Sequence, residues 1–316
     1  MSGLSPYCCS VHTHATLCDG KDTLEEMAAA AYAAGVKYYG VSCHSHTPID
    51  LDDGFVLPAD MTAYREAVLR LREQYDGRME VLLGLEWDSQ SDIQPEGFDY
   101  WIGSAHYQKA PNGKCYAADW GEEAFAACRD EAFGGDALAV AEGYFREVQK
   151  VVARKPVILG HIDLITKLNA GSRFFDESAP RYKAAALEAL HSVDSAATVL
   201  EINTGGMARG YREAPYPALF LLKEWKSMGG RIILTSDAHN ASGILYGYDV
   251  SIALAKAAGV TMTGAGATFP YKKDPNDTNI RIAPTYPTYD ELKIAIALFC
   301  VCVKLAGVNK LLETAE

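Results

Sequence analysis

Two histidines one residue apart stand near the start of the chain, in the stretch SVHTHATLCDG at residues 10–20. Asp19 follows the second of them, His14, by five residues. Imidazole and carboxylate groups at such spacing can hold a divalent metal ion or move protons. A histidine pair on an exposed strand is equally compatible with plain polar surface, so its interpretation depends on partners elsewhere in the chain.

Residues of the same types stand at the ends of apolar runs along the chain. Seven short runs rich in Val, Ile, Leu and Tyr are typical of buried parallel strands: 7–14, 37–44, 79–88, 98–107, 156–163, 198–206 and 231–239. At or near their ends stand His12, His14, His44, Glu86, His106, His161, Asp163, Asp237 and His239. Residues two apart on a strand share a face, so these side chains can point into one cavity. Imidazole and carboxylate without a thiolate in register favour a catalytic centre with several Zn, Mn or Fe ions.

The two remaining histidines show the contrast. His191 stands in the middle of a helical pattern on a predicted surface, and we expect no role for it. His46 lies two residues past His44, beyond the strand, which favours a substrate contact over a metal ligand.

Helical patterns alternate with the predicted strands. The segment DTLEEMAAAAYAAG begins with a capping box formed by Thr23 and Glu26 and ends at Gly35. Further helices are predicted near 61–75, 136–154, 180–197, 215–228, 241–258 and 288–306. This alternation predicts a parallel sheet covered by helices, and we favour a closed barrel over an open sheet. Segments 107–121 and 260–287 are predicted to be irregular, the first over the mouth of the barrel. We expect one domain over residues 1–316.

Composition limits the kinds of partner. The formal net charge of −12 argues against binding nucleic acid through its phosphate backbone. The N-terminus has no basic start followed by an apolar run, and no later run reaches membrane-spanning length, so we expect a cytoplasmic protein without a membrane partner. The eight cysteines form no CxxC pair, which favours reduced thiols.

Seven motifs together resemble the PHP family, the polymerase and histidinol phosphatase domain. They are VHTH, GVSCHSHTPID, LGLEWD, IGSAHY, GHIDLITK, LEINTGG and TSDAHN, within residues 7–250. The chain is most similar to the stand-alone histidinol-phosphate phosphatases, in which GHID, EINT and SDAH recur in this order and a tyrosine follows the histidine of the fourth strand, as Tyr107 follows His106.

The resemblance implies a distorted, TIM-like (β/α)7 barrel that holds three divalent ions at the carboxyl ends of its strands. The implied ligands are His12, His14, Glu86 and Asp237 for the first ion, Glu86, His106 and His161 for the second, and Asp19, His44 and His239 for the third. Glu86, Asp237 and His239 are implied in catalysis, in which a hydroxide bridging two ions attacks the phosphate without a phospho-enzyme.

Substrate contacts are predicted near the strand ends. The candidates are Arg209, Arg212, His46, Tyr107, Lys109 and Asp163. Lys114, Tyr116 and Lys167 are further candidates. Arg209 is preferred over Arg212 as the guanidinium that binds phosphate. Asp163 is equally compatible with orienting a ligand or with a buried structural role. Glu201 and Asn203 are expected either to meet the substrate or to make structural hydrogen bonds.

The resulting expectation is a phosphomonoesterase that hydrolyses L-histidinol phosphate, a small phosphorylated metabolite, to L-histidinol and phosphate in histidine biosynthesis. Two alternatives remain open: a PHP phosphoesterase acting on nucleotides or single-stranded nucleic-acid ends, and a non-catalytic metal-binding barrel. The helix at 288–306 is expected to pack on the barrel or on a second subunit, so both a monomer and a homodimer fit.

Overall fold

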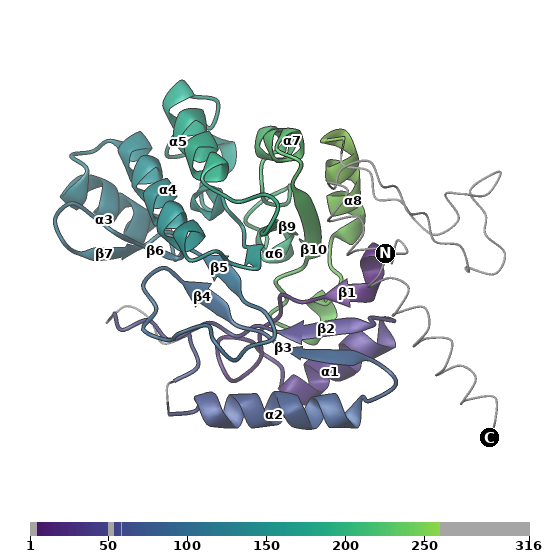
Figure 1. Ribbon diagram of the computed structural model, residues 1–316. Helices are drawn as coiled ribbons and strands as arrows, with labels where there is room; N and C mark the ends of the chain where they lie inside the picture. Colours follow the sequence, from purple (N-terminus) through teal and green to yellow (C-terminus); the bar gives the residue numbers. More distant parts are fainter. Residues whose placement is uncertain (1–4, 50–53, 58, 260–316) are drawn as a thin grey trace, which may run out of the picture. The chain divides into compact units, whose positions relative to one another are not determined.

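Short parallel strands followed by helices build the part of the chain that the computed structural model describes, residues 5–49, 54–57 and 59–259 (Figure 1). The strands are β1 (Cys9–Ser10), β2 (Tyr38–Val41), β3 (Glu80–Leu83), β4 (Glu86–Asp88), β5 (Ile102–Ser104), β6 (Tyr107–Lys109), β7 (Cys115–Ala117), β8 (Ile158–Leu159), β9 (Val199–Asn203) and β10 (Arg231–Thr235). The helices are α1 (Leu24–Ala33), α2 (Met61–Gln74), α3 (Glu122–Ala132), α4 (Ala137–Ala153), α5 (Pro180–His191), α6 (Gly205–Ala208), α7 (Leu219–Ser227) and α8 (Tyr248–Ala257). Each of the seven predicted runs therefore contains at least one strand.

The parallel strands form two sheets. Their orders are β1-β2-β3 and β10-β9-β8-β5-β4, and every neighbouring pair within them is parallel. Isolated parallel bridges join Thr13 to Ala238 and His44 to Glu86, so the two sheets meet beyond the ends of β1 and β2. The predicted α/β class with parallel strands is confirmed, whereas the described ladders do not form one continuous closed sheet.

Tyr100 explains why the run 79–88 is split into β3 and β4. Its ring lies against Gly84, where an added Cβ would come within 2.3 Å of the tyrosine ring, and its hydroxyl donates a hydrogen bond to the carbonyl of Val11. The hydroxyl of Tyr64 lies 2.8 Å from the Gly84 carbonyl on the other side. Two tyrosines thus occupy the space that a continuous strand with side chains would need.

The helices cover the sheets as expected from the alternating pattern. Helices α1 and α2 pack on β2 and β3, α4 packs on β5, and α8 packs on β10 (Figure 1). The predicted capping box at α1 is confirmed: Thr23 Oγ1 accepts a hydrogen bond from the Glu26 N–H, and the Glu26 carboxylate accepts one from the Thr23 N–H. Such a reciprocal cap satisfies two backbone donors that the first turn leaves unpaired.

The prediction of an irregular segment at 107–121 was wrong. Strands β6 and β7 form an antiparallel hairpin there, and its loop contains Asn112 and Gly113, the latter at a φ of 84°. An Asn-Gly pair between two short runs of strand-forming residues is a turn signal that explains the hairpin. Helix α3, which follows directly, was also not predicted.

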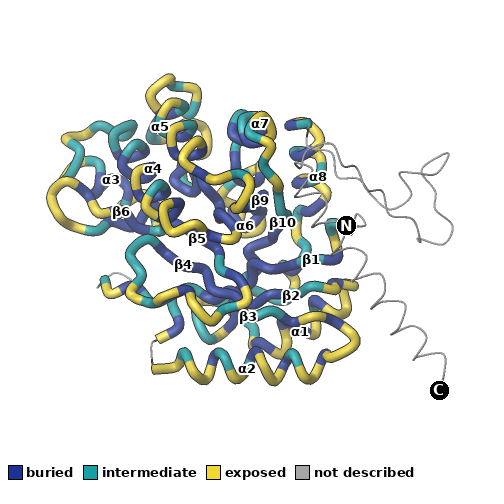
Figure 2. Tube along the Cα trace, viewed as in Figure 1, coloured by how far each residue is buried: buried dark blue, intermediate teal, exposed yellow. Residues whose placement is uncertain are grey.

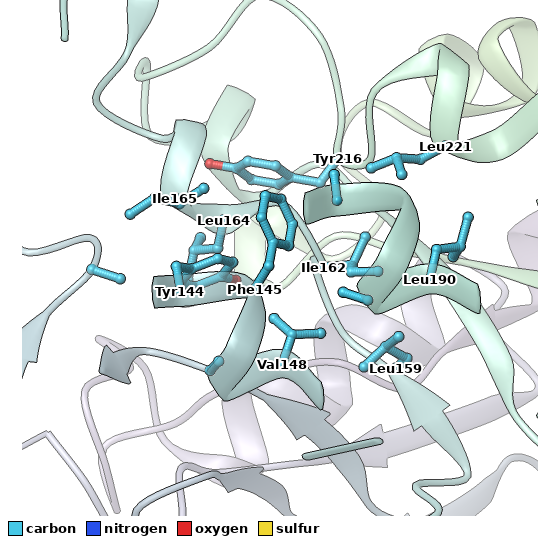
Figure 3. Close-up of a cluster of buried hydrophobic side chains, with 14 of the residues drawn as sticks. Tyr144, Phe145, Val148, Leu159, Ile162, Leu164, Ile165, Leu190, Tyr216 and Leu221 are labelled. Atoms are coloured by element: carbon cyan, nitrogen blue, oxygen red, sulfur yellow. The ribbon is translucent and has the colours of Figure 1, made fainter. Parts of the chain in front are cut away.

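Buried residues, dark blue in Figure 2, make up much of the strands. Two main groups of buried hydrophobic residues pack against the sheets. One joins α1 and α2 to β2 and β3, and includes Met27, Tyr39 and Tyr64. The other joins α4, α5 and α7 to β8 and β9, and its aromatic centre includes Tyr144 and Phe145 (Figure 3). Met61, Phe98 and Leu245 pack against both groups and so connect them.

The predicted helix at 288–306 and the irregular segment 260–287 lie outside the described residues, so the single domain over 1–316 stays a prediction. Within the described ranges, no helix combines the length and apolar character needed to cross a membrane. The six cysteines in the same ranges are free thiols, as expected.

Candidate metal centre

The strand ends bring nine imidazole and carboxylate side chains together. They fall into four overlapping groups, in each of which potential ligand atoms lie within 4.8 Å of one another. The groups are His14, Asp19, His44 and His239; His12, His14 and Asp237; His12, Glu86 and His161; and His44, Glu86 and His106. These nine residues are the predicted metal ligands, and they come from positions between 12 and 239 of the chain.

Glu86, the first residue of β4, lies at the centre of these groups. One carboxylate oxygen lies 2.9 Å from His161 Nε2 and 3.4 Å from His106 Nε2. The other lies 3.0 Å from His44 Nδ1. The hydroxyl of Ser104 on the neighbouring strand β5 donates a hydrogen bond of 2.7 Å to Glu86 Oε1, which fixes the carboxylate in place. Glu86 can therefore bridge two cations.

His12 and His14 follow β1 on one face of the chain and point at the same carboxylates. Their Nε2 atoms lie 3.6 and 3.2 Å from Asp237 Oδ1, and 3.1 and 3.3 Å from Glu86 Oε2. Both Nε2 atoms and Glu86 Oε2 are buried without a hydrogen-bond partner. Buried polar atoms are normally satisfied, so three unsatisfied ones that converge indicate a site for a cation.

Asp237 stands two residues after the end of β10 and has an unusual backbone. Its φ is 48°, in the left-handed region that non-glycine residues rarely adopt. Gly205 lies so close that an added Cβ would come within 2.4 Å of Asp237 Oδ2. This close approach of α6 is the reason why a residue without a side chain stands at position 205, and the strain at Asp237 is typical of a functional site.

Asp19 and His239 form the outer part of the centre with His44. Asp19 Oδ2 lies 3.1 Å from His239 Nε2, and Asp19 Oδ1 lies 3.6 Å from His44 Nε2. Arg209 reaches the same place from the end of α6: its Nη2 donates to Asp237 Oδ2 at 2.9 Å, and its Nη1 lies 2.8 Å from His239 Nδ1. A guanidinium thus stands beside the predicted ligands.

Several imidazoles contact an oxygen atom through Nδ1. His12 Nδ1 lies 2.5 Å from Glu201 Oε1, and His106 Nδ1 lies 3.3 Å from Asp88 Oδ2. His239 Nδ1 lies 2.9 Å from the carbonyl of Asp237. Metal-bound histidines usually have such a partner on the nitrogen that does not bind the ion.

The electrostatics of the centre favour positive charge. Burial by itself would lower the pKa of His12, but the carboxylates of Glu201, Glu86 and Asp237 outweigh it and raise the pKa to about 10. Burial would raise the pKa of Glu86, but the surrounding imidazoles, His12 first among them, hold it well below its usual range. An all-imidazole and carboxylate donor set that stabilises positive charge fits Zn, Mn or Fe ions.

A cavity of about 300 Å³ opens above the centre. Its lining includes six of the predicted ligands: Asp19, His44, His106, His161, Asp237 and His239. The lining also includes Arg209, Lys167, Asp119 and, at its exposed rim, the aromatic side chains Trp120 and Tyr211. Lys167 Nζ lies 2.7 Å from Asp119 Oδ2 and 4.9 Å from the centre of the Tyr211 ring. The cavity thus combines potential metal ligands with cations and aromatic rings.

The predicted substrate contacts divide into two sets. Arg209, Tyr107 and Lys167 line the cavity. The others have different surroundings: Arg212 donates to Thr166 Oγ1, Asp163 accepts a hydrogen bond from the Ala218 N–H, and His46 lies 2.6 Å from Asp92. Lys109 is exposed, while Lys114 and Tyr116 both contact Glu131. Among the described residues these six do not line the cavity.

Three further carboxylates lie near the centre. The sequence left two alternatives open for Glu201 and predicted no role for Asp88 or Asp119. Glu201 is fully buried behind His12, which matches the structural alternative. Asp88 stands two residues after Glu86, and Asp119 ends the hairpin segment. The spacing from Glu86 to Asp88 is a signal that could have identified the second of these, because alternate strand residues share a face.

The sequence and the fold are similar to those of known proteins. The family model of the PHP domain matches residues 9–205, more than half of the chain. The histidinol-phosphatase of Bacillus subtilis is 25% identical over 268 residues, which cover 75% of this chain and 96% of that protein.

Two crystal structures share the fold. One, from Listeria monocytogenes and assigned as a histidinol phosphatase, has a TM-score of 0.64 at 18% identity and covers 76% of this chain and 98% of its own. The other is the histidinol phosphate phosphatase of Lactococcus lactis in complex with zinc, L-histidinol and phosphate, with a TM-score of 0.58 at 19% identity. It covers 81% of this chain and 95% of that one.

The C-terminal segment has a different similarity. The family model of aspartate aminotransferase matches residues 241–315, of which the structure describes 241–259. A protein of Mycolicibacterium smegmatis assigned as an aminotransferase is 50% identical over 62 residues, and the aspartate aminotransferase of Corynebacterium glutamicum is 45% identical over 54. The matched residues span only 14% and 12% of those two proteins.

Proposed function

Because the chain belongs to the PHP domain family, we propose that it is a metal-dependent phosphomonoesterase whose substrate is L-histidinol phosphate. The observation that carries the proposal is the convergence of nine imidazole and carboxylate side chains under a cavity that also contains a guanidinium. The relatives from Bacillus subtilis and Lactococcus lactis support the substrate, because their names specify histidinol phosphate chemistry and the second binds L-histidinol and phosphate.

The nine side chains would hold three divalent ions in the arrangement that the family resemblance implies. His12, His14, Glu86 and Asp237 would bind the first, Glu86, His106 and His161 the second, and Asp19, His44 and His239 the third. The short distances from Glu86 to both His106 and His161 support its bridging role. When bound, such ions lower the pKa of water and neutralise phosphate oxygens, so that no protein nucleophile is needed.

Arg209 would bind the phosphate. Its guanidinium lies in the cavity beside Asp237 and His239, and a guanidinium can donate two parallel hydrogen bonds to phosphate oxygens. Burial would lower its pKa, but the carboxylate of Asp237 outweighs this and keeps the group charged. Lys167 adds a second positive charge to the lining of the cavity, where Asp119 contacts it.

The alcohol part of the ester would lie at the rim. Trp120 and Tyr211 are 52% and 43% exposed although both line the cavity, so their rings are available to a flat group such as the imidazole of the released alcohol. Asp119 lies beside them, and its Oδ1 is buried without a partner. A carboxylate there suits the ammonium group of an amino alcohol.

The proposal includes the closure of the two sheets into a distorted (β/α)7 barrel. It is supported by the bridges from Thr13 to Ala238 and from His44 to Glu86, which link the sheets at two separate edges. Closure would place all strand ends around one mouth, as TIM-like barrels do.

Steady-state phosphate release tests the proposal. L-Histidinol phosphate, adenosine monophosphate and an aryl phosphate would be compared on protein whose metal content is counted by elemental analysis. We expect strong preference for L-histidinol phosphate with two or three ions per chain. Equal or faster release from the other esters would retain the phosphoesterase but reject the substrate, and undiminished turnover in metal-free protein would reject the mechanism.

Two variants and one control refine this test. His12→Ala and Asp237→Ala should each abolish turnover, because both side chains lie at the centre of the ligand groups. His191→Ala is the matched control, since His191 is exposed and contacts only Glu224 among the ion pairs of the described residues. No turnover of any ester by wild-type protein with its ions bound would favour a non-catalytic metal-binding barrel.

A further inference from the structure

We propose that Glu201 is a positioning residue that fixes His12 and the strand end carrying His161 in the proposed metal centre. The inference rests on the metal centre of the proposed function. Glu201 is not among the predicted ligands. By positioning two of them, it would strengthen the binding of ions to the centre.

Glu201 lies in the middle of β9, between β8 and β10, and is completely buried. It belongs to none of the four potential ligand groups and does not line the cavity. A substrate or an ion in the cavity therefore does not touch this carboxylate. Its possible action is through the residues that contact it.

The first of these contacts sets the orientation of His12. Glu201 Oε1 lies 2.5 Å from His12 Nδ1, on the side of the ring that faces away from the other carboxylates. In the neutral form, which is the form that binds a metal ion, an imidazole that donates its proton from Nδ1 leaves Nε2 as the unprotonated nitrogen. His12 Nε2 is the atom that points toward Glu86 and Asp237 and has no hydrogen-bond partner. Glu201 thus selects the tautomer that can bind a cation.

The second contact fixes another strand end. Glu201 Oε2 accepts a hydrogen bond of 2.8 Å from the backbone N–H of His161. This residue follows β8 and points its Nε2 at Glu86 Oε1. One carboxylate therefore orients the side chain of His12 and the backbone of His161, although these two predicted ligands are 149 positions apart in the chain.

Glu201 is itself held rigidly. Thr235 Oγ1 donates to Oε1 at 2.6 Å, and Asn203 Nδ2 donates to Oε2 at 3.0 Å. With His12 and His161, the carboxylate has four hydrogen-bond partners from four strands or strand ends. A support of this kind behind a metal-binding histidine typically contributes 10- to 100-fold to metal affinity.

The test is Glu201→Gln in the full chain, with zinc affinity measured by chelator competition and ions per chain measured by elemental analysis. The glutamine keeps the size of the side chain but puts an amide N–H₂ in place of one carboxylate oxygen, each of which faces two donors, so at least one hydrogen bond is lost. We expect about 10- to 100-fold weaker binding of at least one zinc ion. Cobalt absorption spectra should show altered coordination in the variant, a signal that a loss of stability alone does not produce.

Glu147→Gln is the matched control. Glu147 on α4 is also buried, and it accepts hydrogen bonds from Gln90, Lys150 and the Lys109 N–H without contacting a predicted ligand. It should lose stability but keep zinc affinity. If Glu201→Gln and Glu147→Gln bind zinc as tightly as the wild type, the positioning role is wrong.

Thr235→Val keeps the test valid if Glu201→Gln does not fold. The valine removes one donor to Glu201 and leaves the carboxylate in place, so zinc affinity should fall by less than about tenfold. Unchanged affinity in a folded Thr235→Val protein would then contradict the proposal. Failure of the wild type to bind zinc would reject the metal centre itself, which separates the two failures.

Discussion

Neutralising Glu86 should weaken more than one ion of the proposed centre. Glu86 belongs to two of the four potential ligand groups, and its carboxylate oxygens lie 2.9–3.4 Å from the imidazoles of five histidines. Glu86→Gln preserves the volume of the side chain and an acceptor for Ser104 but removes the negative charge. The variant therefore tests charge and bridging rather than packing.

The size of the effect follows from burial. Glu86 is 1% exposed, so its charge is screened little by water. Removing one partner from a buried set of charges costs about 3–5 kcal/mol, and each 1.4 kcal/mol corresponds to about a tenfold change in an equilibrium constant. We expect zinc affinity to fall by about two to three and a half orders of magnitude.

The assay is chelator competition combined with elemental analysis and phosphate release. Glu86→Gln should retain at most one ion per chain after dialysis and lose turnover on L-histidinol phosphate. Glu147→Gln, which neutralises a buried carboxylate away from the centre, should keep both properties. A Glu86→Gln protein with the wild-type number of ions and turnover within about threefold would refute the bridging role.

Further predictions concern stability, phosphate binding and thiol reactivity. Chelation should lower the melting temperature by about 5–11 °C in differential scanning fluorimetry. The reason is that a ligand at 100 times its Kd stabilises the fold by about 2.7 kcal/mol, and each kcal/mol shifts the melting temperature by about 2–4 °C. An unchanged melting temperature would contradict metal binding. Arg209→Gln should reduce kcat/KM about 10- to 100-fold by removing a charge-assisted contact to phosphate, whereas a change below threefold would exclude that contact. Gly84→Ala should lower the urea midpoint by an amount equivalent to about 1–3 kcal/mol, because its methyl group would collide with Tyr100; an unshifted midpoint would reject the packing argument. Burial raises the pKa of the Cys128 thiol to about 12, so iodoacetamide should not label it at pH 8 in the native protein, as mass spectrometry would detect; native labelling at the rate found in urea would disprove this.

The positions of the strand-end residues could be predicted because their pattern is local. His12 and His14 are two apart at the end of one predicted strand, and Asp237 and His239 at the end of another, so each pair was expected to share a face. The carboxyl ends of parallel strands meet at one edge, which brings such pairs together from distant parts of the chain. The PHP resemblance is confirmed by the family model, whereas the assignment of each residue to an ion stays a prediction.

Other features depend on tertiary contacts that sequence spacing does not specify. Glu201 has the same strand periodicity whether it faces a substrate or His12, and only the packing of β9 between β8 and β10 decides this. The break at Gly84 follows from Tyr100, which is distant in sequence. The hairpin of β6 and β7 has a local signal at Asn112 and Gly113, which the interpretation of 107–121 as irregular overlooked. The aminotransferase similarity of 241–315 was likewise not predicted.

The origin of the predicted ligands in both halves of the fold has a consequence for folding kinetics. Each hydrophobic group can assemble largely from its own stretch of chain, one mainly before residue 84 and the other after it. The ligand set is complete only when the segment after β10 has docked beside β1, a contact between Thr13 and Ala238 that closes a very long loop. Such contacts form late because loop closure is costly in entropy. Ions of the proposed centre would therefore bind as the last step of folding, and their escape would require this closing contact to open.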